Sequence, residues 1–335
     1  MSLKIQKALS MMLICILTVC LFAGCGKRKV ESSSREPLVD VNIAVLKGPS
    51  ALGMLKLMEQ SDNGTARNNY HFNIRTAADQ IAPEIIKGTL DIAAVPTNLA
   101  ATLYQKTNGG VSILAVNTLG ALSLLTNGED ITSISQLRGK TIYSTGKGST
   151  PEYAINYILE KNGLKVGTDV FVDYKAEHAE LATMVISGDV RISVLPQPFV
   201  TNVTMKNKDV KIALDLSEEW EKLPDSNGSK LVMGCLVVRN EFLEKNREAV
   251  NTFLQEYQLS SNQANEKLDV TANLAEHYDV MPAQVVGLAL PKCNILYMDG
   301  AEMKQNVSAY LNVLFNANHA SVGGALPKDD FYYAK

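Results

Sequence analysis

Residues 85–98, IIKGTLDIAAVPTN, and residues 185–198, VISGDVRISVLPQP, repeat one pattern at an offset of one hundred positions. Each copy opens with an apolar run that ends at a glycine, Gly88 in the first and Gly188 in the second. Glycine in this place is typical of a helix that stops in the left-handed conformation. The pattern therefore predicts two helices that end at equivalent points of two similar units.

A β-rich run follows the glycine in each copy, over residues 90–95 and 190–195. Both runs are short and β-rich, which indicates strands. The next residue is Pro96 or Pro196, and proline cannot continue a central strand because it has no N–H to donate. We therefore expect each strand to end just before its proline.

The same offset relates two loops further upstream, KGPS at residues 47–50 and KGST at residues 147–150. Each loop follows a strand-like run and precedes a helix-like run. Strands that alternate with helices in this way indicate a parallel sheet with helices on both faces. The sequence thus predicts an α/β fold with two similar lobes.

We expect the first lobe to comprise residues 40–123 and 235–335, and the second lobe residues 124–234. Two crossings of the chain then leave a hinge and a cleft between the lobes. Within this plan we expect one helix over residues 51–59 and a long strand-like segment over residues 111–126. Four C-terminal helices are expected near residues 241–265, 268–277, 282–289 and 301–317. A further helix over residues 80–87 is expected to have Asp79 as its N-cap and Pro83 in its first turn.

The N-terminus has the pattern of an export signal. Lys4 and Lys7 precede an apolar run at residues 11–22, which is shorter than the roughly 20 residues that span a bilayer. The sequence Leu-Phe-Ala-Gly-Cys that ends at Cys25 resembles a bacterial lipobox, which implies that Cys25 is diacylated. We therefore expect residues 1–24 to be a signal peptide and the polar, serine-rich residues 25–39 to be a flexible tether.

Removal of residues 1–24 takes away two of the 32 basic residues and none of the 35 acidic ones, which leaves a formal net charge of −5. That balance, without a basic stripe, argues against nucleic-acid binding. Two cysteines remain besides Cys25, namely Cys235 and Cys293. An extracytoplasmic location permits a disulfide between them, but we favour two separately buried thiols, which are common in protein cores.

Candidate ligand-binding residues lie in the two loops and in the turns after the buried strands. Glycines let a backbone approach a ligand closely, and the free N–H groups at a helix start favour anionic or acceptor groups. Open α/β sheets bind ligands at the carboxyl ends of their strands. The expected site residues are Lys47, Gly48, Pro49, Ser50, Thr97, Asn98, Asn117, Gly146, Lys147, Gly148, Ser149, Thr150 and Gln197.

Several of these residues also have a purely structural interpretation. Ser149 and Thr150 are suitable helix N-caps, Asn98 is suited to a turn, and Lys47 and Lys147 are at least as well explained as solvated loop residues. The loop at residues 146–151 departs from a dinucleotide-binding fingerprint because its sixth position is proline. Nucleotide binding is therefore not expected.

The remaining polar and aromatic residues give no sign of catalysis. The four histidines are scattered, so no metal site and no cofactor are predicted. His178 is interpreted as part of a solvated helix start. Trp220 is placed on a helical surface turn or lobe edge without a role. No nucleophile motif is present, and the sequence predicts that the protein is not an enzyme.

Six motifs carry a resemblance to the substrate-binding lipoproteins of ABC importers, in the nitrate, sulfonate, taurine and thiamine-pyrimidine-precursor group. They are LRGK (137–140), GKGSTPE (146–152), SGDV (187–190), LPQPF (195–199), LYMDG (296–300) and SVGG (321–324). The resemblance implies the type II periplasmic-binding-protein fold, with two α/β lobes around a ligand cleft. It also implies a monomeric receptor that binds a small polar or anionic organic solute, contacts the permease subunits and is anchored to the membrane through Cys25.

Three alternatives stay open at this point, and one of them is a sensory or adhesive lipoprotein that keeps the fold without transport. The bound solute could be a thiamine pyrimidine precursor, or the fold could serve an enzyme similar to the pyrimidine synthases. The export signal argues against the enzyme, because enzymes of those families act in the cytoplasm. The cysteine-rich motif of the pyrimidine synthases is also absent from this sequence.

Overall fold

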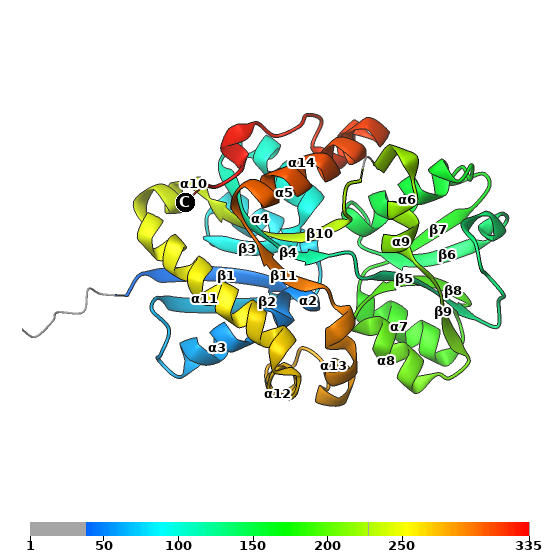
Figure 1. Ribbon diagram of the computed structural model, residues 1–335, viewed down its shortest axis with the longest axis horizontal. Helices are drawn as coiled ribbons and strands as arrows, with labels where there is room; N and C mark the ends of the chain where they lie inside the picture. Colours follow the sequence, from blue (N-terminus) through cyan, green and yellow to red (C-terminus); the bar gives the residue numbers. More distant parts are fainter. Residues whose placement is uncertain (1–37, 227, 335) are drawn as a thin grey trace, which may run out of the picture. The chain divides into compact units, whose positions relative to one another are not determined.

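The computed structural model of the protein describes residues 38–226 and 228–334. Residues Val39–Lys335 form one compact unit, which is shown in Figure 1. The expected signal peptide, Cys25 and the tether up to residue 37 lie outside the described residues. Within the described residues, no helix combines the length and the apolar character needed to cross a membrane.

The first lobe is built on a six-stranded mixed sheet with the strand order β11-β4-β10-β3-β1-β2. Strands β1, β2 and β3 are parallel, whereas β10 is antiparallel to β3 and to β4. The strand bounds are β1 Asp40–Leu46, β2 Asn69–Arg75, β3 Ile92–Pro96, β4 Val111–Leu119, β10 Val232–Arg239 and β11 Ile295–Met298.

The second lobe is built on a five-stranded sheet with the order β7-β6-β8-β5-β9. Here β6, β7 and β8 are parallel, and β5 is antiparallel to its two neighbours. The strand bounds are β5 Leu122–Asn127, β6 Thr141–Thr145, β7 Phe171–Lys175, β8 Ile192–Pro196 and β9 Val210–Asp215. The predicted α/β fold with two lobes is confirmed.

Helices cover both faces of each sheet (Figure 1). One face of the first sheet is packed by α3 Leu55–Asp62, α11 Arg247–Glu266, α12 Leu268–His277 and α13 Ala283–Ala289, and the other by α4 Ala82–Lys87, α5 Thr97–Lys106 and α14 Gly300–Ala317. The second sheet lies between α6 Thr150–Lys161 with α9 Leu216–Glu221 and α7 His178–Ser187 with α8 Phe199–Lys206.

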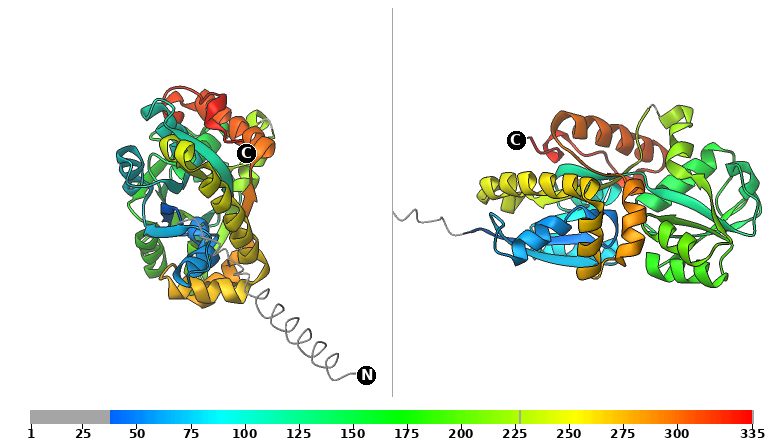
Figure 2. Two further views of the ribbon diagram at one scale, coloured as in Figure 1. Left: turned by 90° about the vertical axis from the view of Figure 1, so that its left-hand side faces the viewer. Right: turned by 60° about the horizontal axis from the view of Figure 1, so that its bottom comes forward.

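Two short α-helices complete the set, α2 Pro49–Leu52 and α10 Asn240–Lys245. Single 3₁₀ turns occur at Ala78–Gln80, Ile134–Leu137, Pro224–Ser226, Leu290–Lys292, His319–Val322 and Asp329–Phe331. The long helix α11 runs along the first lobe, and α12 and α13 lie at its end (Figure 2). The helices expected near residues 268–277, 282–289 and 301–317 are present, whereas the one expected near residues 241–265 is divided at Asn246 into α10 and α11.

The repeated pattern forms the centre of both sheets. Gly88 and Gly188 cap α4 and α7 in the left-handed conformation, with φ of 78° and 88°. The strands that follow, β3 and β8, are buried along their whole length and have neighbours on both sides. Pro96 and Pro196 are the last residue of each strand rather than the first residue after it. At the end of a strand the missing N–H interrupts no further ladder bond.

Three expected elements differ in detail. The helix expected over residues 51–59 is divided into α2 and α3 at Gly53, where a Cβ would lie 3.2 Å from the Tyr257 hydroxyl and from an Ile295 methyl group. Residues 111–126 form two strands in different sheets, because the chain crosses between the lobes at Gly120, which packs against Ser217.

The third difference concerns the start of the helix expected over residues 80–87. Asp79 lies in a 3₁₀ turn, and α4 starts after Ile81 with Pro83 in its first turn. The expected N-cap at Asp79 is therefore wrong, whereas the expected place of Pro83 is confirmed.

We propose to divide the unit into lobes where the chain passes from one sheet to the other. The first crossing joins β4 to β5 at Gly120 and Ala121, and the second lies between the 3₁₀ turn at Pro224–Ser226 and β10. The first crossing lies two to three residues before the boundary expected at residue 123, and the second lies before the boundary expected at residue 234. The hydrophobic cluster on the α14 side continues from one lobe into the other.

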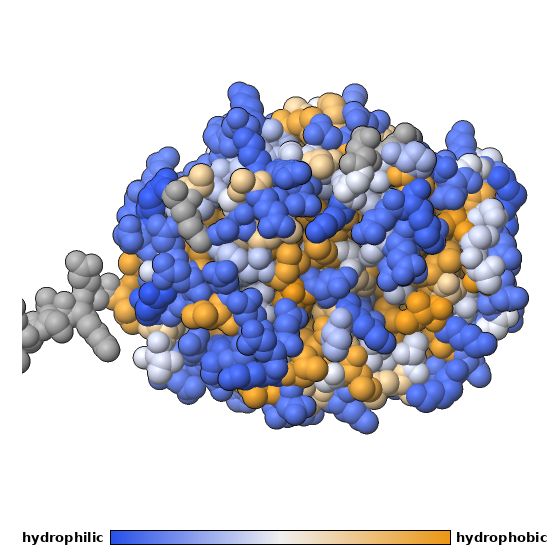
Figure 3. All heavy atoms as spheres, viewed as in Figure 1, coloured by the Kyte–Doolittle hydropathy of each residue, from blue (hydrophilic) through white to orange (hydrophobic). Residues whose placement is uncertain are grey.

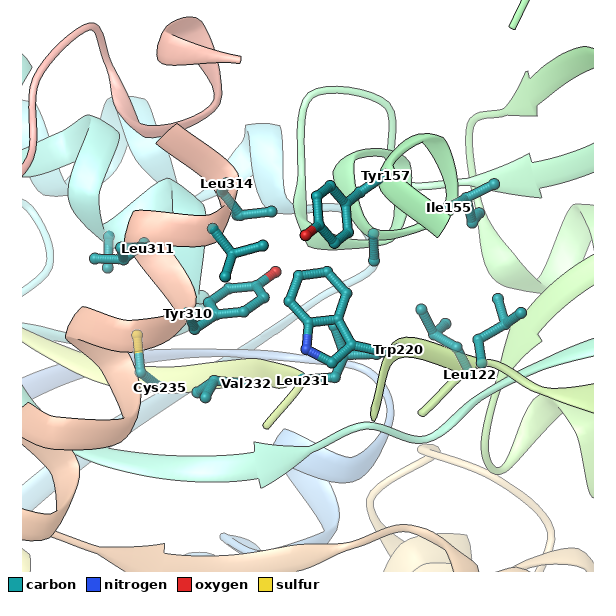
Figure 4. Packing of buried hydrophobic residues seen from close by; sticks show 14 of the residues in the cluster. Leu122, Ile155, Tyr157, Trp220, Leu231, Val232, Cys235, Tyr310, Leu311 and Leu314 are labelled. Atoms are coloured by element: carbon teal, nitrogen blue, oxygen red, sulfur yellow. The ribbon is translucent and has the colours of Figure 1, made fainter. Parts of the chain in front are cut away.

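Trp220 lies in that shared cluster and is fully buried, so the expected surface turn is wrong, whereas the alternative of a lobe edge agrees with its place between helices of both lobes. Its ring centroid lies 5.0 Å from that of Tyr157 on α6 and 5.5 Å from that of Tyr310 on α14 (Figure 4). The indole N–H donates to the Ser229 carbonyl at 3.0 Å. Leu216 and Trp220 are one helical turn apart and both buried, so α9 turns an apolar face inward.

Cys235 and Cys293 are both buried free thiols, as favoured from the sequence. The Cys235 thiol donates to the Val95 carbonyl and the Cys293 thiol to the Ala289 carbonyl. Burial raises the pKa of each thiol to about 12, so both stay protonated at neutral pH.

Hydrophilic residues cover most of the face shown in Figure 3, and hydrophobic residues lie between them in separate places. The exposed large apolar side chains include Leu259 and Leu288. Scattered apolar residues of this kind are normal on protein surfaces, and we assign them no function.

Candidate functional site

A cleft of about 380 Å³ lies between the two sheets, at the strand ends that face each other. Loops after the parallel strands line it from both lobes. The first lobe contributes the β1–α2 loop, the loop after β2 and the end of β3. The second lobe contributes the β6–α6 loop, the β7–α7 loop and the end of β8. The end of β4, the crossing residue Ala121 and the start of β10 complete the wall. This is the ligand-binding edge of open α/β sheets.

The order of the strands gives the cleft two distinct ends. The inner end lies beside the crossing from β4 to β5, where Thr118, Ala121, Pro196 and Met233 line the wall. The outer end lies between the edge strands β2 and β7. There the Thr76 hydroxyl donates to the Glu177 carboxylate at 3.0 Å, so the two lobes meet at the outer end as well.

The β6–α6 loop brings the start of a 12-residue helix to the middle of the cleft. Gly146 and Gly148 both have positive φ, 73° and 76°, which glycine adopts without strain. The Ser149 hydroxyl donates to the Gly146 carbonyl at 2.7 Å instead of capping α6. The Glu152 carboxylate accepts the Gly148 N–H, so an acidic group of the protein already interacts with part of this helix start.

The opposing loop of the first lobe starts the much shorter helix α2. Gly48 is its N-cap, Pro49 occupies the first turn and Ser50 follows. The Asn117 amide donates to the Ser50 hydroxyl at 3.4 Å and so supports Ser50 from behind. The Asn117 carbonyl oxygen lies 2.6 Å from the place where a Cβ on Gly234 would stand. Glycine at position 234 therefore leaves room for Asn117 beneath the cleft wall.

The charged side chains that line the cleft are three lysines, Lys47, Lys147 and Lys175, and one carboxylate, Asp79. The Lys47 ammonium lies 3.7 Å from the exposed Asp279 carboxylate. The Lys175 ammonium lies 3.3 Å from Asp173 and over the Tyr143 ring. Lys147 is exposed on its loop. The balance of charge on the wall is therefore positive and favours an anionic ligand.

His178 lines the cleft, so the expected solvated helix start is wrong. Its Nδ1 lies 2.6 Å from the Thr145 hydroxyl, and its ring packs against Phe199 at 5.2 Å between centroids. Burial lowers the pKa of His178 to about 4. The imidazole is therefore neutral at pH 7 and adds no positive charge to the wall.

Seven of the thirteen predicted site residues line the cleft: Lys47, Gly48, Pro49, Ser50, Gly146, Lys147 and Ser149. Direct contact between these residues and a ligand stays a prediction. Of the other six, Gly148 is exposed on its loop, and Thr97, Asn98, Asn117, Thr150 and Gln197 are buried behind the wall.

Asn98 and Thr150 connect the lobes. The Asn98 amide donates to the Gly148 carbonyl at 3.3 Å and to the Ser321 carbonyl at 3.1 Å, and its oxygen accepts from the Thr150 hydroxyl at 3.2 Å. Asn98 is 1% exposed and Thr150 fully buried. We name the pair of bonds from Asn98 to Gly148 and Thr150 the Asn98 bridge.

Gln197 and Thr97 are also buried behind the wall. The Gln197 side-chain oxygen accepts from the hydroxyl and N–H of Thr201, in the first turn of the helix α8 that follows Gln197. The Thr97 hydroxyl is buried as well, and it interacts with the Cys235 thiol. These side chains stabilise their own lobes in the present arrangement.

The sequence interpretation missed several wall residues, including Thr76, Thr118, Thr145, Tyr174 and His178. Tyr174, Thr76 and Thr145 end or follow parallel strands, so the carboxyl-end rule could have found them. Thr118 lies on an antiparallel strand that reaches the cleft only through the crossing, and no local signal marks it. Among the described residues, no group of three or more histidine, cysteine or carboxylate side chains is arranged to hold a metal ion.

Residues 63–276 match the protein family described as "ABC transporter, phosphonate, periplasmic substrate-binding protein". The chain belongs to this family. The predicted type of protein, a periplasmic substrate-binding component of an ABC importer, is thereby confirmed. No curated protein matches the chain by sequence.

Solved structures of the same fold support the architecture. An ABC transporter protein from Parabacteroides distasonis is 23% identical with a TM-score of 0.72, and the match covers 89% of this chain and 99% of that one. The alkanesulfonate-binding protein SsuA from Xanthomonas axonopodis pv. citri, bound to MOPS, is 15% identical with a TM-score of 0.69, covering 88% and 96%. The nitrate-binding protein NrtA from Synechocystis is 12% identical with a TM-score of 0.64, covering 85% and 84%. At these identities the similarity shows the fold alone.

Proposed function

We propose that this protein captures a small organic anion in the cleft between its lobes and delivers it unchanged to an ABC importer. The observation that carries the proposal is the excess of positive charge on the wall, which is lined by three lysines and by one carboxylate, Asp79. Two solved structures of the same fold are named as an alkanesulfonate-binding protein, SsuA, and a nitrate-binding protein, NrtA. A sulfonate or phosphonate group suits the charge of this wall, and the volume of the cleft leaves room for an organic substituent.

The cleft is larger than a bare oxyanion requires. Its volume of about 380 Å³ falls in the range of small-molecule sites. Apolar side chains such as Val95, Ala121, Pro196 and Met233 contribute much of its inner wall. These surfaces favour a ligand with a carbon skeleton over nitrate, because burial of apolar area adds to the affinity.

We further propose an extracytoplasmic location with a lipid anchor on Cys25, and a monomeric protein that contacts permease subunits. The support comes from the export pattern of residues 1–24 and from the family. A thiamine pyrimidine precursor remains the alternative ligand, and an enzyme on the same fold the alternative activity. No observation in the cleft favours the pyrimidine over an organic anion, or an enzyme over a receptor.

The test is a thermal-shift screen of the purified full-length protein, followed by calorimetric titration. The screen contains nitrate, ethanesulfonate, 2-hydroxyethanesulfonate, ethylphosphonate, small carboxylates and an aminopyrimidine. A ligand present at 100 times its Kd stabilises the native state by about 2.7 kcal/mol. We expect the organic sulfonates or phosphonates to raise the melting temperature most.

Lys147→Gln provides the matched test of the charge. It should weaken binding of the organic anion and reduce the salt dependence of Kd. Lys245 is exposed and pairs with Glu241 on α10, outside the cleft. Lys245→Gln should therefore leave the affinity for the anion and the salt dependence of Kd unchanged. Stabilisation by the pyrimidine alone would support the alternative ligand, and conversion of a bound compound to a new product would support an enzyme.

A further inference from the structure

Tyr174 lines the outer end of the cleft, and its buried hydroxyl has no hydrogen-bond partner among the described residues. The residue lies near the end of β7. Burial raises the pKa of this phenol, so the group is a neutral donor at pH 7. An unpaired buried hydroxyl is destabilising unless a water or a ligand supplies its partner.

A second neutral group stands on the same loop. His178 begins α7, four residues after Tyr174 (Figure 1). Thr145 interacts with its Nδ1 and Phe199 packs on its ring, so the orientation of the ring is fixed. Nε2 is left as the second hydrogen-bonding atom of the ring.

The sheet order places these two groups beside the expected anion site. Strand β7 is the direct neighbour of β6, and adjacent strands lie about 4.8 Å apart. The β7–α7 loop is therefore about one strand spacing from the β6–α6 loop that presents Lys147. A ligand that contacts both loops needs an anionic group and a second polar group a few bonds away.

The charged side chains at the outer end of the cleft do not supply the contact to this second polar group of the ligand. The Lys175 ammonium lies beside Asp173 and the Tyr143 ring. Asp79 is an exposed carboxylate on the opposite lobe and would select an ammonium group. The two kinds of ligand, one with a hydroxyl and one with an amine, are therefore distinguishable by experiment.

We propose that Tyr174 and His178 form a neutral hydrogen-bonding subsite for an uncharged polar group of the ligand. The ligand is then an organic anion with a hydroxyl or similar group near its anionic end. This inference rests on the proposed function, because it takes the anion site at the neighbouring loop as given. It assigns ligand selection to two residues outside the glycine-containing loops.

The experiment compares probes that differ in one group. Ethanesulfonate and 2-hydroxyethanesulfonate differ only in the hydroxyl, and ethylphosphonate and 2-hydroxyethylphosphonate form a second such pair. Calorimetric titration of the full-length protein should give tighter binding of the hydroxyl compound by about threefold to tenfold for each hydrogen bond gained. 2-Aminoethanesulfonate should bind more weakly than the hydroxyl compound, because the subsite is neutral.

Tyr174→Phe removes the hydroxyl, and its effect is measured both on the affinity ratio and on the melting temperature of the free protein. It should bring the affinity ratio within each pair close to one, and it should leave the melting temperature of the free protein unchanged or raise it, because an unpaired hydroxyl is removed. Tyr70→Phe is the matched control, since the Tyr70 hydroxyl is buried but bonds to Glu256 at 2.6 Å and to Asn68 at 3.0 Å, away from the cleft. That control should lower the melting temperature and keep the affinity ratio.

His178→Asn tests the imidazole, because an asparagine amide can keep the Thr145 bond while Nε2 is lost. His178→Gln, which places an amide near Nε2, should recover part of the preference for the hydroxyl compound. An affinity ratio near one in the wild type, or a ratio unchanged in Tyr174→Phe and His178→Asn, overturns the subsite while leaving the anion receptor intact. Tightest binding of the aminoethyl compound overturns it too, in favour of Asp79. Failure of every anion to bind refutes the proposed function itself.

Discussion

Removal of the Asn98 bridge should weaken ligand binding without any change in the residues that line the cleft. Asn98 on α5 of the first lobe makes two hydrogen bonds to the second lobe, at 3.3 Å to the Gly148 carbonyl and at 3.2 Å from the Thr150 hydroxyl. When the lobes separate, these groups bond to water instead. The bridge therefore stabilises only the arrangement in which the lobes meet around the ligand.

The expected magnitude follows from these two bonds. A neutral hydrogen bond contributes about 0.5–1.5 kcal/mol net, and both bonds are longer than the usual 2.9–3.0 Å of an N–H···O bond or the 2.7–2.8 Å of an O–H···O bond. We therefore expect Asn98→Ala to disfavour the closed state by about 1–2 kcal/mol, which corresponds to a Kd about fivefold to thirtyfold higher. The lost bond to the Ser321 carbonyl lies within the first lobe and should lower the melting temperature further.

Asn240→Ala is the matched control. The Asn240 amide also donates to a glycine carbonyl, that of Gly109 at 2.6 Å, and its oxygen also accepts from a hydroxyl, that of Ser112 at 2.8 Å. All of these groups belong to the first lobe. The control should therefore lower the melting temperature but leave Kd within about twofold.

Calorimetric titration with the tightest-binding anion of the screen measures Kd, and small-angle scattering with and without that anion measures closure. Asn98→Ala should show the larger radius of gyration at equal saturation. If Asn98→Ala and Asn240→Ala destabilise the protein equally and neither changes Kd, the bridge is only a local structural contact and the reasoning is refuted.

Three further predictions concern other parts of the chain. Trp220→Ala should lower the free energy of unfolding by about 3–5 kcal/mol, because it empties the space between Tyr157 and Tyr310; a loss below 1 kcal/mol in denaturant titration would contradict the shared core. Because the pKa of His178 is about 4 in the folded state and about 6.5 unfolded, its contribution to stability is complete above pH 6.5 and is lost as the pH falls towards 4. The free energy of unfolding should fall by up to about 3 kcal/mol in this way. His178→Asn should reduce this loss in a pH series of unfolding measurements. Labelled fatty acid should enter the wild type and not Cys25→Ser, and equal labelling of both would exclude the lipid anchor.

The sequence predicted the centre of each sheet well, because that part of the fold is encoded locally. The helix end at Gly88 and Gly188 requires a residue that adopts positive φ, and the following apolar run has no stable place except inside a sheet. The same local signals placed the glycine-containing loops at the ends of β1 and β6. Seven of the residues predicted in this way do line the cleft.

The sequence alone did not show which of two neighbouring side chains on one loop lines the cleft and which contacts the other lobe. Ser149 lines the cleft while the adjacent Thr150 bonds to Asn98 behind it, although both follow the same glycines. Tyr174 and His178 looked like the end of a strand and a solvated helix start. Only the packing of β7 at the edge of its sheet, opposite β2, brings them to the wall of the cleft.

The sequence by itself determined the two α/β units, their equivalent strands and the glycines that shape the loops, since each depends on residues within one turn or one strand. The tertiary structure decided what lies between the units: the Asn98 bridge, the core around Trp220 and the neutral outer end of the cleft. The bridge joins Asn98 to residues 50 and 52 positions away, and the core joins Trp220 to Tyr157 and Tyr310, which are 63 and 90 positions away. Hydrophobic burial and hydrogen bonding between distant segments are fixed only when the whole chain has packed, because no local pattern specifies the partner.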